Sequence, residues 1–247
     1  MWTKIAAAAA CLVLSANLVS AAEITVIAST AMREVLEALV PPFERASAHK
    51  VAVSFLSGAV LPVKIKEGAH ADLVVTTPQT IDDLVKAGKV VAGTRVDFVR
   101  SAAGVAVRAG AAKPDISTPE ALKAALLAAK TVGYSQGASG QHFLTVVEKL
   151  GIADAVKRKA VIAQGRPVGA AIASGEAEIG VQQVAELRPV PGTDVIGEMP
   201  ADLQKQIPYS AGIVAKGKDE QTARALVSFL RSEAALEVLK RKGMDLP

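Results

Sequence analysis

Two periods of hydrophobic positions alternate along most of this chain. Short β-branched runs at residues 23–28, 50–55 and 71–76 have the composition of strands. Apolar residues at helical spacing follow each run, as at Met32, Val35, Leu36 and Leu39. We expect Pro41-Pro42 to kink or end that first helix. The β-α-β-α-β-α order predicts a parallel sheet covered by helices.

The pattern restarts in the second half of the chain. Thr118-Pro119 has the residue types of a helix start, with threonine as the cap. Further strands are expected at 96–100, 104–107, 131–134, 160–162, 178–181 and 211–215, and further helices at 139–150, 168–174 and 220–239. Two arrangements fit: two α/β lobes with crossings near Gly104 and Tyr209, or one continuous doubly wound sheet. The pattern alone favours neither.

The first 22 residues have the features of a secretory signal peptide. Lys4 supplies the positive charge, residues 5–19 carry no charge, and Ser20-Ala21-Ala22 offers small residues for cleavage near Ala22. A membrane anchor is disfavoured because the apolar run is short and no basic stop follows it. Cys11 is the only cysteine, so the exported chain would contain neither a disulfide nor a thiolate metal site.

Composition narrows the expected partners. Residues are 51 % hydrophobic but only 3 % aromatic, and few stacking side chains argue against a nucleic-acid partner. A net charge of +4 from scattered lysines and arginines is a mild field that would help a small anion approach. His49, His70 and His142 show no metal-ligand spacing, and we expect neither a metal nor a cofactor.

The strand-to-helix turns are rich in small hydroxyl residues and glycine. Ligands of open α/β sheets bind beyond the carboxyl ends of the strands, where helix N-termini and hydroxyls supply hydrogen-bond donors for an anion. Each turn alone would serve as an ordinary helix cap, but their recurrence in both halves predicts an anion site. The candidate ligand-binding residues are Ser29, Thr30, Ala31, Ser57, Gly58, Thr77, Ser139, Gly140, Arg166 and Gln183.

Two arginines lie in or beside these turns. Arginine grips a carboxylate through two parallel hydrogen bonds. Arg166 lies within a turn and is the better candidate. Arg33 stands one turn into a helix, where exposure to solvent is equally expected.

Enzyme motifs are sparse, and we expect a chain without catalytic activity. Neither a Gly-x-Ser-x-Gly elbow nor a phosphate-binding loop is present. Ser139 and His142 leave open a secreted hydrolase, although no orienting acid accompanies them. A further alternative is the effector domain of a transcription regulator, which the signal peptide disfavours.

Several segments resemble the periplasmic molybdate-binding proteins, a family of type II periplasmic binding proteins of ABC transporters. The most specific is 61–73, and 54–58, 179–181 and 209–213 agree. The resemblance implies two lobes, residues 23–103 plus 210–247 and residues 104–209, each a mixed, mostly parallel sheet flanked by helices. It also implies a monomeric periplasmic receptor that closes on a small anion by a hinge motion and delivers it to a membrane permease.

The resemblance is looser at the ligand. Family members hold the oxyanion with two serine hydroxyls and often a tyrosine, positions that fall at Ala31, Gly58 and Gln183 here. With the hydroxyl pattern shifted, molybdate or tungstate is one expectation, and a small organic carboxylate is the alternative.

Overall fold

The computed structural model describes residues 22–246. The predicted signal peptide therefore lies outside the described residues except for Ala22. No helix within 22–246 combines the length and apolar character needed to cross a membrane.

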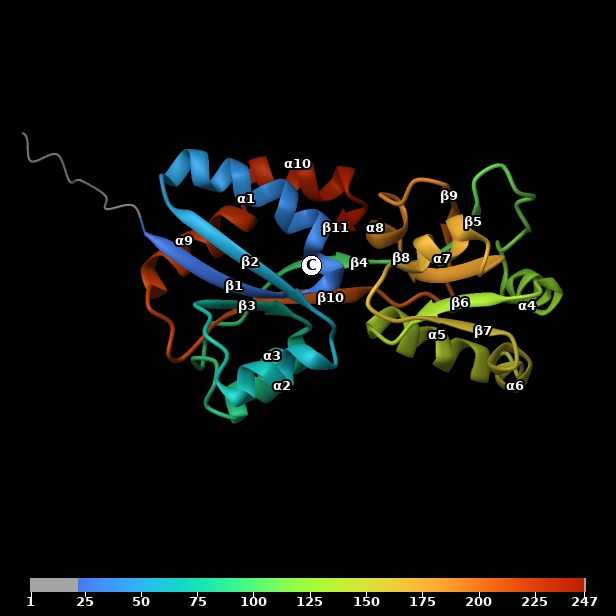
Figure 1. The fold of residues 1–247 in the computed structure, drawn as a ribbon, viewed down its shortest axis with the longest axis horizontal. Coiled ribbons are helices and arrows are strands. Elements are labelled where there is room, and N and C mark those ends of the chain that lie inside the picture. Colours follow the sequence, from blue (N-terminus) through green and yellow to red (C-terminus); the bar gives the residue numbers. More distant parts are fainter. Residues whose placement is uncertain (1–21, 247) are drawn as a thin grey trace, which may run out of the picture.

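The chain forms two mixed sheets, each flanked by helices (Figure 1). The first has the strand order β11-β4-β10-β3-β1-β2. Strand β1 pairs in parallel with β2 and β3, whereas β10 and β11 pair antiparallel with their neighbours. Its strands are β1 (Glu23–Ser29), β2 (Lys50–Leu56), β3 (Leu73–Thr76), β4 (Val96–Ser101), β10 (Ile207–Ile213) and β11 (Met244–Asp245).

Helices cover both faces of this first sheet. A large apolar cluster lies under α1, α9 and α10, and a smaller one lies under α2 and α3. Figure 1 shows these two groups on opposite sides of the strands. The helices are η1 (Thr30–Met32), α1 (Arg33–Ser47), α2 (Val60–Glu67), α3 (Pro78–Lys86), α9 (Glu220–Leu230) and α10 (Glu233–Arg241).

The second sheet has the order β7-β6-β8-β5-β9. Strands β6, β7 and β8 are parallel, and β5 runs antiparallel to β8 and β9. Its strands are β5 (Ala103–Arg108), β6 (Val132–Ser135), β7 (Ala160–Ala163), β8 (Ile179–Gln183) and β9 (Thr193–Glu198). Its helices are α4 (Pro119–Ala128), α5 (Ala138–Lys149), α6 (Ala153–Lys157), α7 (Val168–Ser174) and α8 (Val184–Leu187).

The chain passes between the two sheets twice. Strand β4 ends at Ser101 and β5 begins at Ala103, while the return runs between β9 and the start of β10 at Ile207. This arrangement confirms the two-lobed α/β fold over the single continuous sheet. The proposed lobe limits at residues 103/104 and 209/210 stay a prediction.

Some elements differ from the sequence-based expectation. Helix α1 continues through Pro41 and Pro42 to Ser47. Buried Phe43 packs into the core just beyond the prolines, and this contact favours continuation despite the backbone hydrogen bonds that proline cannot make. Helices α6 and α8 and strands β9 and β11 were not among the elements expected from the sequence.

Buried Asp72 joins the start of β3 to β1 and to the segment that precedes α9. Its carboxylate accepts hydrogen bonds from the backbone N–H groups of Thr25 at 2.7 Å, of Lys218, and of Asp219 at 3.1 Å. Asp72→Ala would leave these donors without their acceptor, so the free energy of unfolding should fall by about 3 kcal/mol in a urea titration. Asp202→Ala removes an exposed carboxylate and should change it by less than about 0.5 kcal/mol. Equal effects of the two variants would contradict this role.

Candidate functional site

A pocket of about 670 Å³ is lined by turns from both sheets. The first sheet contributes the turns after β1, β2 and β3. The second contributes the turns after β6, β7 and β8. In both groups the strands are parallel, and their carboxyl ends point to the same edge. The topology therefore brings segments that are distant in sequence to one site.

Nine of the ten predicted positions line this pocket: Ser29, Thr30, Ala31, Ser57, Gly58, Thr77, Ser139, Arg166 and Gln183. Gly140 does not. A Cβ atom at Gly140 would lie 1.6 Å from the carbonyl oxygen of Ser135, so this glycine lets α5 pack against the turn before it. The role of all ten residues in binding stays a prediction.

Most donors around the pocket are uncharged. Helices α3 and α5 both start at the pocket, so their first backbone N–H groups and positive dipole ends are directed toward it. Thr77, the N-cap of α3, shares a 3.0 Å hydrogen bond with the Thr80 hydroxyl. These turns form a cradle suited to anionic oxygens.

Both candidate arginines border the pocket but are held by acids. Arg166 donates two hydrogen bonds to Glu176, one of them at 2.9 Å. These bonds lower the pKa of Glu176 to about 2. Arg33 pairs with Glu37 at 3.1 Å and lies 4.2 Å from the centre of the Phe55 ring. Each arginine would have to leave or share its acid to grip a ligand.

The pocket also contains a carboxyl group, that of Glu186 on α8. Its Oε1 accepts from Gln182 Nε2 at 2.8 Å and its Oε2 from Gln183 Nε2 at 3.1 Å. Gln182 is oriented in turn by the backbone N–H of Val168 at 2.8 Å. Glu186 is partly exposed because it borders the pocket, but protein encloses its other sides. This burial raises its pKa to about 7, and the amide hydrogen bonds offset only part of the effect.

Gln183 joins Glu186 to the opposite sheet. Its Nε2 donates to the Tyr209 hydroxyl at 2.6 Å, so a side chain of β8 contacts one of β10. Burial and the nearby Glu186 raise the pKa of Tyr209. The Oε1 atom of Gln183 is buried and has no hydrogen-bond partner among the described residues.

The hydrolase alternative gains no support from this geometry. Ser139 lines the pocket, whereas His142 does not, and its Nε2 lies 2.8 Å from the carbonyl oxygen of Leu203. Burial lowers the pKa of His142. The serine and the histidine are therefore not arranged as nucleophile and base.

Sequence reasoning missed Glu186 and Tyr209. Glu186 is an acid among apolar neighbours, three residues beyond the end of β8. This position was the feature that could have identified it as a site residue. Tyr209 was expected only as a crossing point between the lobes, and its place at the pocket depends on the antiparallel return of β10 between β3 and β4.

Two α/β lobes on either side of a pocket lined by hydrogen-bond donors define a two-lobed binding protein. The chain belongs to the family described as bacterial extracellular solute-binding protein, which matches residues 24–245. Among curated proteins, it is 33 % identical to an aconitate isomerase from Pseudomonas sp., over 90 % of this chain and 87 % of that protein. It is 31 % identical to the molybdate-binding protein ModA of Azotobacter vinelandii, over 92 % of this chain and 91 % of that protein.

Solved structures show the same fold. The periplasmic molybdate-binding protein of Azotobacter vinelandii superposes with a TM-score of 0.74 at 21 % identity, covering 91 % of this chain and 99 % of that one. The expected class, an extracytoplasmic solute-binding protein related to the molybdate receptors, is confirmed.

One sequence-based expectation is wrong. We expected a chain without catalytic activity, but a relative that is 33 % identical over nearly its whole length is named as an enzyme. Motif inspection missed this possibility because the sequence carries neither a Gly-x-Ser-x-Gly elbow nor a phosphate-binding loop.

Proposed function

We propose that this chain binds aconitate, or a closely related unsaturated polycarboxylate, in the pocket between its sheets and interconverts its isomers by moving one proton. The aconitate isomerase relative supports this assignment. Aconitate is a propene carrying three carboxylates. Moving a proton from its methylene carbon to its vinylic carbon shifts the double bond and exchanges the cis and trans forms.

The observation that carries the proposal is the Glu186 carboxyl group in the pocket wall, with its pKa raised to about 7. A general base is most effective when its pKa lies near the working pH. A solvent-exposed glutamate would be ionised but much too weak a base. The enclosure of Glu186 therefore gives it the basicity that this chemistry requires.

Glu186 alone can remove the proton and return it. The carboxylate removes a proton from the methylene carbon, so a C–H bond breaks and an O–H bond forms. The electron pair spreads over the three allyl carbons and the carboxylates on the two end carbons. Glu186 then returns the proton to the former vinylic carbon. Electrons are neither gained nor lost overall, and the carboxylate on the central carbon serves only for binding.

The rest of the pocket suits a polycarboxylate. A volume of about 670 Å³ is in the ordinary range for an organic ligand. Hydroxyls and helix N-termini surround it, and Arg33 and Arg166 border it from different lobes. Closure by a hinge near the two crossings would bring both sets of donors onto the same ligand.

The test is an isomerisation assay of purified protein with cis- and trans-aconitate, followed by proton NMR in D₂O. We expect interconversion, with deuterium entering at the vinylic and methylene carbons. Because the base must be ionised, kcat/KM should rise with pH through about 7 and level off above it. A protein that binds aconitate but neither isomerises it nor exchanges its protons would contradict the proposal.

A second candidate function is a receptor for a molybdate-like oxyanion, which passes its ligand to an ABC transporter permease. The 31 % identity to ModA and the hydroxyl-rich turns favour it. Under either function we propose export, with cleavage near Ala22, a monomer in the periplasm, and lobes at residues 23–103 plus 210–247 and 104–209. A thermal-shift comparison of aconitate with molybdate, tungstate and sulfate distinguishes the two ligand classes.

A further inference from the structure

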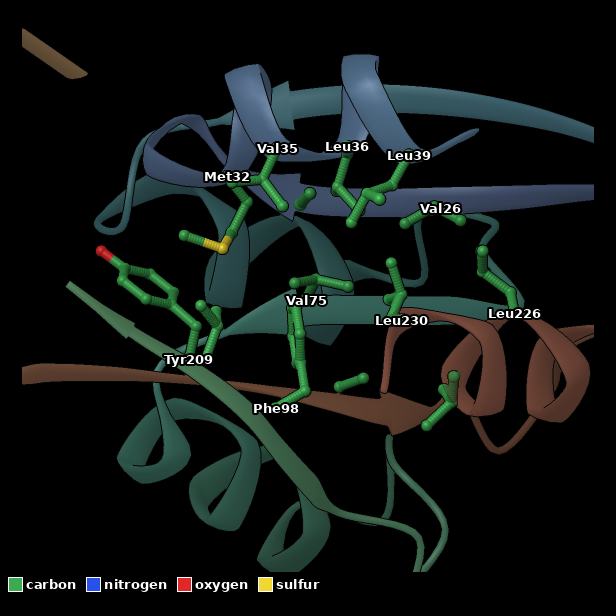
Figure 2. Packing of buried hydrophobic residues seen from close by; sticks show 14 of the residues in the cluster. Val26, Met32, Val35, Leu36, Leu39, Val75, Phe98, Tyr209, Leu226 and Leu230 are labelled. Atoms are coloured by element: carbon green, nitrogen blue, oxygen red, sulfur yellow. The ribbon is translucent and has the colours of Figure 1, made fainter. Parts of the chain in front are cut away.

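Tyr209 reaches the pocket from the first sheet. Tyr209 is 1 % exposed and packs beside Met32 and Phe98 in the core. Figure 2 shows the ring at the edge of this cluster, with the hydroxyl oxygen pointing away from the packed side chains. Tyr209 is also among the residues that line the pocket. Its hydroxyl therefore lies where apolar core meets ligand space.

The hydrogen bond to Gln183 fixes the role of this hydroxyl. An amide nitrogen can only donate, so the Tyr209 oxygen accepts at 2.6 Å. The hydroxyl hydrogen then remains, and the described residues offer it no acceptor. Since the pKa of Tyr209 is raised, the hydroxyl keeps this hydrogen at physiological pH. The hydroxyl hydrogen is therefore available to a ligand.

The Gln183 amide is held in one orientation. Its two N–H groups are used by Glu186 at 3.1 Å and by Tyr209 at 2.6 Å. The reverse orientation would place an amide oxygen against the Glu186 carboxylate and bury two donors without partners, at a cost of about 1–3 kcal/mol for each. Gln183 thus holds the Glu186 carboxylate and the Tyr209 hydroxyl at the two N–H groups of one amide nitrogen.

We propose that Tyr209 is a second catalytic residue, which donates a hydrogen bond to the substrate carboxylate that gains negative charge when Glu186 removes the proton. This inference rests on the proposed isomerisation. Proton removal breaks the C–H bond and moves its electron pair through the allyl carbons onto the oxygens of the conjugated carboxylate. A donor directed at these oxygens stabilises the transition state more than the ground state. Tyr209 gives up no proton, so the balance at Glu186 is unchanged.

The pairing defines the substrate class. Glu186 and Tyr209 both bond the Nε2 atom of Gln183, so a substrate that contacts both has its acidic C–H close to the carboxylate that takes up the charge. An unsaturated acid with a C–H group on the carbon next to its double bond fits this requirement. A saturated hydroxy acid lacks the conjugation and should bind without proton exchange.

The test compares Tyr209→Phe with the matched variant Tyr134→Phe. Tyr134 is the other tyrosine of the chain, and it packs against Phe143 in the core of the second lobe. We expect Tyr209→Phe to lower kcat for aconitate about 100-fold, with KM changed by less than about threefold. Tyr134→Phe should keep the kcat of the unmodified protein.

A second measurement keeps the inference testable if Tyr209→Phe folds poorly. Fluorotyrosine incorporated into Tyr134→Phe labels Tyr209 alone, because the sequence has two tyrosines. Its ¹⁹F resonance should shift when aconitate binds. An unmoved resonance, or full kcat in Tyr209→Phe while the unmodified protein is active, overturns the role of Tyr209. An unmodified protein that neither isomerises nor exchanges protons overturns the proposed function instead.

Discussion

Replacing Glu186 with glutamine should reduce isomerisation of aconitate by at least about 10³-fold and leave the ligand bound. The amide has nearly the same shape as the carboxylic acid but cannot take a proton from carbon. Binding should persist because the hydroxyl-rich turns are untouched. At pH 8 affinity should even rise, since unmodified Glu186 is largely ionised there and repels an anion. Steady-state kinetics and calorimetry at pH 6 and pH 8 measure both effects.

Glu237→Gln is the matched control for this substitution. Glu237 is exposed on α10, and its contact with Arg241 is a surface pair at 3.9 Å. Such pairs contribute little, so its kcat should equal that of the unmodified protein. Retention of activity in Glu186→Gln would assign the proton transfer to another group.

Gly140→Ala should lower the free energy of unfolding by about 3 kcal/mol and weaken ligand binding. The new methyl group would lie 1.6 Å from the Ser135 carbonyl oxygen, so α5 or the preceding turn must move. That movement would also displace Ser139 at the pocket. Urea denaturation and calorimetric titration with aconitate measure the two losses.

Gly58→Ala is the control for stability. Nothing lies within 4 Å of a Cβ atom at Gly58, so the free energy of unfolding should change by less than about 0.5 kcal/mol. Equal stability of the two alanine variants would contradict the explanation that close packing of α5 against Ser135 requires glycine at position 140.

The sequence predicted the fold well where local patterns are strong. Helix α7 begins at Val168 and ends at Ser174 as the apolar spacing indicates, and Thr118 caps α4 through its side chain as its residue type suggests. Nine of the ten candidate positions line one pocket for a similar reason. The carboxyl ends of parallel strands meet at one edge, so knowing the turns was enough to assemble most of the pocket wall.

The chemistry of the pocket could not be predicted in the same way. The basicity of Glu186 comes from enclosure by β8, α8 and neighbouring elements, and enclosure is a property of packing rather than of residue type. Tyr209 approaches it only because β10 returns antiparallel into the first sheet. Arg166 had the right residue type and the right turn, but its partner Glu176 lies ten residues further along and gave no signal.

Gln182, Gln183 and Glu186 fall within five consecutive positions at the junction of β8 and α8. Most of the turns that would hold the anion come from other parts of the chain. A lineage could therefore gain or lose proton transfer through a few substitutions in one short segment and keep its capacity to capture anions.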